Sequence, residues 1–218
     1  MVDSGRTYLP AAGHDWSLPL YDPLVKLLGG DAARAALLDQ AVVRPGQRVL
    51  DIGCGTGSLA VLIKRRYPHV EVVGLDPDPR ALARARRKGQ RAALSIQLEQ
   101  GFSDELPYPE GSFDRVFSSF MFHHLEAAGK EATLREVRRV LKPGATFHML
   151  DFATPDSNSA GWLARLLHSS HRLKDNSDER ILGLLRQAGL SDAKRVADRA
   201  LLVGHIAYYQ ASVPTSKS

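Results

Sequence analysis

The sequence predicts an α/β fold in which one mostly parallel sheet is covered by helices on both faces. One observation is that short apolar runs alternate with helix-forming stretches, as they do where helices connect parallel strands. Another is that residues 49–76 contain a complete strand, turn, helix and strand unit. The length of 218 residues suits a single domain of this class with a large core.

The unit at residues 49–76 predicts a site that holds a nucleoside. An apolar strand runs into a glycine-rich turn, Val-Leu-Asp-Ile-Gly-Cys-Gly-Thr-Gly at residues 49–57, and a helix is expected from Ser58 to Tyr67. A second apolar strand, residues 70–75, then ends on Asp76. Glycines let a ligand approach the backbone closely, and an acid roughly 20 residues past them can accept hydrogen bonds from both ribose hydroxyls.

An acid beside the glycines indicates the charge of the ligand. Asp51 lies two residues before Gly53, and the turn has the spacing Gly53, Gly55, Gly57. A carboxylate at this place repels a pyrophosphate, whereas it attracts an ammonium or sulfonium group. We therefore expect a ligand that carries positive charge.

The segment before the first strand is expected to be helical over residues 21–43, with a break near Gly29. Asp31 is a suitable N-cap for a helix over residues 32–42. Pro45 and the glycine that follows it mark the turn into the first strand.

Helices and strands continue to alternate after Asp76. Pro79 is expected to begin a helix that runs to about Lys88 and is ended by Gly89. The pattern predicts further strands over residues 94–99, 113–119, 145–152, 193–199 and 202–209, and further helices over residues 129–141, 162–167 and 178–188.

The motif series is similar to that of a known family. Residues 51–57 match the first motif of the class I S-adenosylmethionine-dependent methyltransferases, and Asp76 stands where that family has its ribose-binding acid. Residues 100–114 resemble the family's adenine-contacting turn, and residues 138–144 resemble the turn before its fifth strand. The match most resembles the branch of the quinone-biosynthesis and small natural-product methyltransferases.

This resemblance implies a Rossmann-like methyltransferase domain with a seven-stranded sheet, which is mostly parallel and ends in an antiparallel C-terminal hairpin. It implies an N-terminal helical lid segment at residues 1–44, followed by the S-adenosylmethionine-binding domain at residues 45–218. Within that segment, residues 14–23 either cover the cofactor, with Tyr21 near the methyl donor, or anchor the first helix. The implied cofactor is S-adenosylmethionine, with S-adenosylhomocysteine as the product.

One position departs from the family pattern. Phe102 stands where the family usually has an aspartate that can bind the adenine amino group. The ring either stacks on the purine or fills core. Together, the motifs and the resemblance predict these cofactor-binding residues: Asp51, Gly53, Gly55, Thr56, Asp76, Pro77, Phe102, Ser103, Ser119 and Tyr21.

The candidate catalytic residues follow from the rule that ligands bind at the carboxyl ends of the strands in an open α/β sheet. His123 and His124 come after the strand at residues 113–119, and Asp151 lies near the end of the next strand. If the acceptor is a hydroxyl or an acidic carbon, a histidine can remove its proton and a carboxylate can fix the histidine tautomer. The alternative is that one histidine caps the next helix and that Asp151 only ends its strand. Trp162, Leu166, His168 and His171 are candidates for another wall of the acceptor site.

Composition narrows the possible partners. The single cysteine, Cys54, excludes an internal disulfide, and the histidine spacings predict no metal site. The net charge of +5 lies largely on two basic helices, which we interpret as solvated faces, so nucleic acid is not an expected partner. No apolar run has the length of a membrane span. We expect a cytoplasmic monomer or homodimer.

The function favoured by these patterns is O- or C-methylation of a small molecule. Three alternatives stay open: a nicotinamide-dependent oxidoreductase, which shares the strand, helix and strand unit; a methyltransferase that modifies nucleic acid; and a protein that binds S-adenosylmethionine without catalysis.

Overall fold

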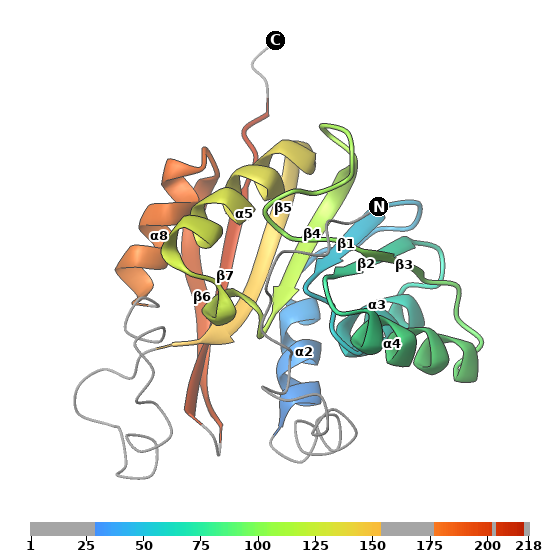
Figure 1. The fold of residues 1–218 in the computed structure, drawn as a ribbon. Coiled ribbons are helices and arrows are strands. Elements are labelled where there is room, and N and C mark those ends of the chain that lie inside the picture. The colour runs from blue at the N-terminus through green and yellow to red at the C-terminus, as the bar shows by residue number, and fades with distance from the viewer. Residues whose placement is uncertain (1–28, 154–176, 202–203, 216–218) are drawn as a thin grey trace.

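A computed structural model describes residues 29–153, 177–201 and 204–215. Its centre is a seven-stranded sheet with the strand order β3-β2-β1-β4-β5-β7-β6 (Figure 1). The strands are β1 (Arg48–Ile52), β2 (Glu71–Asp76), β3 (Gln97–Gln100), β4 (Phe113–Ser119), β5 (Leu141–Phe152), β6 (Ser191–Leu201) and β7 (Gly204–Ser212). Pairing is parallel from β3 to β5, and β7 is antiparallel to both of its neighbours. The expected fold class is thereby confirmed.

Helices lie on both faces of this sheet (Figure 1). The described helices are α2 (Gly30–Asp39), α3 (Ser58–Arg66), α4 (Pro79–Arg91), the short 3-10 helix η2 (Phe122–His124), α5 (Ala127–Val140) and α8 (Asp178–Gln187). Within these ranges, no helix combines the length and the apolar character needed to cross a membrane.

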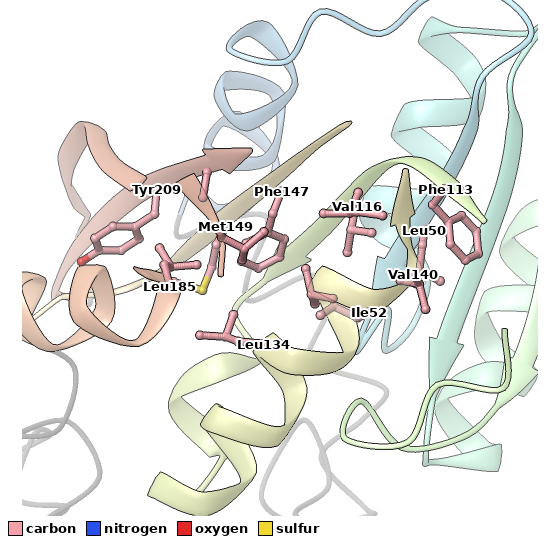
Figure 2. Close-up of a cluster of buried hydrophobic side chains, with 14 of the residues drawn as sticks. Leu50, Ile52, Phe113, Val116, Leu134, Val140, Phe147, Met149, Leu185 and Tyr209 are labelled. Carbon is pink, nitrogen blue, oxygen red and sulfur yellow. The ribbon is translucent and has the colours of Figure 1, made fainter. Parts of the chain in front are cut away.

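Alternation along the strands divides the core into two layers. On β1, Leu50 and Ile52 pack on the side of α5 and α8, whereas Val49 packs on the side of α2 and α3. Figure 2 shows the first layer, in which Leu134 of α5 and Leu185 of α8 contact the sheet. Every one of these side chains is fully buried, so both faces of the sheet are closely packed against helices.

Two residues expected to cap helices do not do so. Gly29, not Asp31, is the N-cap of α2, with a left-handed φ of 88°, and Asp31 pairs with Arg34 in the first turn. Gly89 does not end α4, which continues to Arg91. Gly89 is buried because the turn after the helix folds back over it: a Cβ at Gly89 would lie 3.6 Å from the Leu94 carbonyl oxygen.

The same turn shortens the strand expected over residues 94–99. The Leu94 N–H donates to the Gly89 carbonyl at 3.0 Å and so completes the end of α4 instead of joining the sheet. The left-handed residue of this turn is Ala93, with φ 53°. Pairing with β2 therefore begins only at Gln97. The helix expected over residues 162–167 lies outside the described residues.

The loop between β3 and β4 is attached to α5 by polar contacts. Glu136 accepts a hydrogen bond from the Leu106 N–H at 2.7 Å, and Arg139 donates to the carbonyls of Leu106 and Tyr108 at 2.9 and 2.6 Å. The hydroxyls of Ser103 and Thr133 bond at 2.8 Å. These contacts fix the loop that carries Phe102 beside the carboxyl ends of β2 and β3.

Gly57, at the start of α3, packs closely against Ala85 of α4, and this packing can be tested by substitution. A Cβ at Gly57, where φ is +76°, would lie 2.8 Å from the Ala85 Cβ of α4, whereas a Cβ at Gly46, where φ is +79°, would meet nothing within 4 Å in the part of the chain that the structure describes. We expect Gly57→Ala to lower the free energy of unfolding by about 2–4 kcal/mol and Gly46→Ala by about 1–2 kcal/mol, because only the first adds overpacking to backbone strain. Urea denaturation of both variants measures the difference. Equal losses would contradict close packing of α4 against the glycine loop.

Candidate active site

The candidate site lies along the edge of the sheet where the parallel strands end (Figure 1). Ile52 at the end of β1 is in register with Leu75 of β2 and Ser118 of β4. The glycine loop, Asp76, the two histidines and Asp151 therefore gather at one edge, as the general rule for open α/β sheets requires.

The three glycines of residues 53–57 have different surroundings. All have positive φ, at 64°, 53° and 76°. A Cβ at Gly53 would lie 2.3 Å from the Met121 Cγ, so the segment after β4 lies directly against the glycine loop. A Cβ at Gly55 would meet no atom of the described residues within 4 Å, although Gly55 lies between two closely packed glycines. The loop therefore leaves room for a ligand above Gly55.

Asp76 is held rigidly at the end of β2. Its Oδ2 accepts the Gly55 N–H at 2.8 Å, and its Oδ1 accepts the Asp78 N–H at 2.9 Å. Burial raises the pKa of Asp76 to about 6, and the two N–H groups partly oppose that rise. Each oxygen keeps a further lone pair, so the carboxylate can accept two more hydrogen bonds, such as those of a ribose.

Asp51 is fully buried, and neither of its carboxylate oxygens accepts a hydrogen bond from the described part of the chain. Burial raises the pKa of Asp51 to about 7; the charge of Arg34 and the polar backbone N–H of Ala60 lower it in part, and the charge of Asp76 raises it further. A buried carboxylate without hydrogen bonds is costly when ionised. Asp51 is thus a buried acid whose ionised form a cationic ligand would stabilise.

His123 and Asp151 form a hydrogen-bonded pair across the ends of β4 and β5. The His123 Nδ1 lies 2.6 Å from the Asp151 Oδ1, and the His123 N–H donates to the Oδ2 at 3.0 Å. The Phe152 N–H donates to the Oδ1 at 2.7 Å. Burial acts to raise the pKa of Asp151, but His123 and these N–H groups outweigh it, so the pKa lies below its ordinary value.

This pair gives the two ring nitrogens of His123 different roles. Nδ1 faces an ionised carboxylate and carries the hydrogen, so Nε2 is the nitrogen that can accept a proton. The side chain is 17% exposed, whereas Asp151 is fully buried. The arrangement can therefore serve as a general base with an orienting acid.

His124 is placed differently from its neighbour. Its ring centroid lies 4.0 Å from that of His123 with an interplanar angle of 39°, and the carboxylate of Asp151 bonds His123 instead. The structure thus brings His123 and Asp151 together and puts His124 beside them, which the sequence left open.

The other predicted cofactor residues lie around the same edge. Thr56 is buried and accepts a hydrogen bond from the Lys88 Nζ at 3.2 Å. The Ser103 hydroxyl bonds Thr133 of α5. Pro77, Phe102 and Ser119 are half-buried at the ends of β2, β3 and β4. Tyr21, Trp162, Leu166, His168 and His171 lie outside the described residues.

Sequence reasoning missed Arg34 and Phe120. Arg34 is 7% exposed in α2, and its guanidinium lies 5.4 Å from the Phe120 ring centroid. Ala33, Arg34, Leu37 and Leu38 share the buried face of α2. At this helical spacing an arginine stands within an apolar stripe. That position in the pattern is the sequence signal that could have identified Arg34 as a buried residue. In the described ranges, no three acidic, histidine or cysteine side chains gather as metal ligands.

The burial of Asp51 predicts how stability depends on pH. Its folded pKa of about 7 lies above the ordinary value of 3.8, so the folded state keeps a proton that the unfolded state releases. The free energy of unfolding must therefore fall as the pH rises from 3.8, the ordinary pKa, to about 7, the folded pKa. We expect Asp51→Asn to be more stable than the parent by about 2–4 kcal/mol at pH 8 and nearly equal to it at pH 4.

Urea denaturation of the ligand-free protein at both pH values measures this difference. Asp39→Asn is the matched control, because Asp39 is exposed at the end of α2 and should change stability little at either pH. A constant difference between Asp51→Asn and the parent across the pH range would show that folding does not raise the pKa of Asp51.

Comparison with known proteins agrees with this geometry. A family model described as a methyltransferase domain matches residues 49–144. The chain is 38% identical over 151 residues to a demethylmenaquinone methyltransferase of Thermus thermophilus, covering 68% of each chain. It is 40% identical over 151 residues to a demethylmenaquinone methyltransferase of Deinococcus radiodurans, covering 68% of this chain but 62% of that relative.

Solved structures show the same fold. A phosphoethanolamine N-methyltransferase 2 of Haemonchus contortus, in complex with S-adenosyl-L-methionine, superimposes with a TM-score of 0.77 at 16% identity over 97% of this chain and 61% of that one. From the sequence relatives, the fold and the motif series together, the chain belongs to the class I S-adenosylmethionine-dependent methyltransferases, in the quinone-biosynthesis branch.

Proposed function

We propose that this methyltransferase methylates a ring carbon of a small hydroxylated aromatic acceptor of the quinol type. The observation that carries the proposal is the His123–Asp151 pair, which the packing of Met121 on Gly53 holds next to the glycine loop. Relatives named demethylmenaquinone methyltransferases support a quinol as the acceptor. The expected product of the methyl donor is S-adenosylhomocysteine.

The residues at the edge of the sheet fit S-adenosylmethionine. Asp76 would accept hydrogen bonds from the ribose hydroxyls, and the open space at Gly55 would admit the ligand close to the backbone. Asp51, whose oxygens accept no hydrogen bond from the described residues, would face a positively charged group of the donor. When bound, S-adenosylmethionine supplies an electrophilic methyl group on a sulfonium.

His123 would perform the proton transfer. Its Nε2 would accept the proton of the acceptor's hydroxyl, which gives a phenolate with high electron density on the ring carbons beside the oxygen. The ionised Asp151 would stabilise the resulting imidazolium and keep the ring oriented. After the new carbon–carbon bond forms, that ring carbon loses its own proton and the hydroxyl is restored, so one proton leaves for each methyl group transferred.

The ribose assignment is tested at Asp76. We expect Asp76→Ala to weaken binding of S-adenosylhomocysteine by about 10²-fold, because hydrogen bonds to a charged acceptor are worth about 1.5–3 kcal/mol each. Isothermal titration calorimetry measures this change. Asp39→Ala removes an exposed acid at the end of α2 that pairs with Arg66, and it should bind like the parent. An Asp76→Ala variant with unchanged affinity would place the ribose elsewhere.

The base is tested by exchanging each histidine separately. We expect His123→Gln to lower kcat with naphthoquinol by about 10²- to 10⁴-fold and to leave affinity for S-adenosylhomocysteine nearly intact. His124→Gln should lower kcat much less, because His123 is the histidine paired with Asp151. Asp151→Asn should lower kcat by an intermediate factor.

The exposed His69 provides the matched control, since His69→Gln changes the same residue type outside the site. Release of S-adenosylhomocysteine under saturating donor measures turnover. If His124→Gln, and not His123→Gln, abolishes turnover, the assignment of the base is reversed. Full turnover in both variants would mean that the acceptor is methylated without a histidine base.

A further inference from the structure

A row of aromatic rings runs along the carboxyl edge of the sheet beside the proposed base. The ring centroids of Phe120 and Phe152 are 5.3 Å apart and tilted by 48°. Phe152 contacts His123 edge to face, with centroids 5.1 Å apart and an angle of 83°. His124 continues the row at 4.0 Å from His123. All four residues are half-buried, so each presents part of its surface at this edge.

The backbone of Phe120 is held in an unfavourable conformation. Its φ is 56°, in the left-handed region that a bulky side chain rarely adopts. The Phe120 N–H donates to the Leu150 carbonyl at 2.9 Å, which fixes this conformation at the end of β4. Strained residues that the surrounding structure holds in place occur preferentially at functional sites. A glycine would suit this backbone better, and one side of the phenyl ring packs against the core layer on the side of α2 and α3, which leaves the other part of the ring exposed at this edge.

Arg34 supports the same ring from α2. Its buried guanidinium lies 5.4 Å from the Phe120 ring centroid, within the range of a cation–π contact. Phe120 is therefore positioned by β4, β5 and α2 together. The ring contacts continue from Phe120 through Phe152 to the imidazole of His123.

We propose that Phe120 and Phe152 are specificity-determining residues that hold the planar ring of the methyl acceptor beside His123. This inference rests on the proposed function and deepens it. Aromatic rings favour offset-stacked and edge-to-face contacts with other rings, which an aliphatic acceptor cannot make. Because Phe152 lies in edge contact with His123, an acceptor ring packed against Phe152 brings its hydroxyl next to the base.

Binding of a ring that lacks the hydroxyl needed for methylation tests the inference apart from turnover. Calorimetry measures the affinity of naphthoquinone for enzyme saturated with S-adenosylhomocysteine, in the parent, Phe120→Leu and Phe152→Leu. We expect each variant to raise the Kd for naphthoquinone by about tenfold, because stacking is lost. Affinity for S-adenosylhomocysteine should change by less than about twofold.

Two further variants keep the test decisive. Phe120→Gly suits the left-handed backbone and serves if Phe120→Leu does not fold, and it should lose naphthoquinone affinity at least as strongly. Tyr67→Leu removes a half-buried ring at the end of α3 and should bind naphthoquinone like the parent. With naphthoquinol as substrate, the Phe120 and Phe152 variants should raise KM more than they lower kcat.

The outcomes separate this inference from the proposed function. A parent that binds S-adenosylhomocysteine and naphthoquinone, with variants that bind naphthoquinone equally well, overturns the role of the two phenylalanines only. A parent that binds S-adenosylhomocysteine but not naphthoquinone also overturns it. A parent that binds naphthoquinone but does not methylate naphthoquinol or any other hydroxylated arene contradicts the proposed function instead.

Discussion

The carboxyl edge of the sheet holds three buried carboxyl groups, and the arrangement of the residues around them depends on the free-energy cost of keeping a carboxylate away from water. Such a group must be hydrogen-bonded or it becomes costly to ionise. Asp151 accepts three hydrogen bonds and stays ionised, and Asp76 accepts two backbone N–H groups. Asp51 accepts none from the described residues and has a pKa of about 7. Three buried acids thus differ in pKa: the charge and hydrogen bond of His123, together with two backbone N–H groups, hold that of Asp151 below its ordinary value, whereas burial raises those of Asp76 and Asp51 to about 6 and about 7.

Close packing connects the parts of the site that the acids stabilise. Met121 lies against Gly53, and Ala85 of α4 lies against Gly57, so the glycine loop is held from two sides, while no atom of residues 29–153, 177–201 and 204–215 crowds Gly55. The histidine pair begins two residues after Met121. The position of the proposed base, His123, therefore depends on the contact between Met121 and Gly53, which also shapes the glycine loop. A change in this contact would move both the base and the loop.

Several features lower the stability of the fold while they serve the proposed chemistry. Asp51 has no hydrogen bond from the described residues, and Phe120 has a strained backbone. Both lie at the carboxyl edge of the sheet, whereas the cores of the two apolar layers on either side consist of buried side chains. Stability supplied by these layers offsets such local costs, as is general for functional sites.

The sequence by itself determined the sheet, the glycine loop, Asp76 and the short set of candidate histidines and acids, because periodicity and turn chemistry are local properties. Only the tertiary structure decided which histidine pairs with Asp151, where α4 ends and what surrounds Phe120. His123 and Asp151 are 28 residues apart in the chain, and their contact depends on how β4 and β5 pair. Gly89 looked like a helix end because a glycine's own preference is visible in the sequence, whereas the turn that folds back on it is not. Contacts between distant segments are set by packing, which no local pattern records.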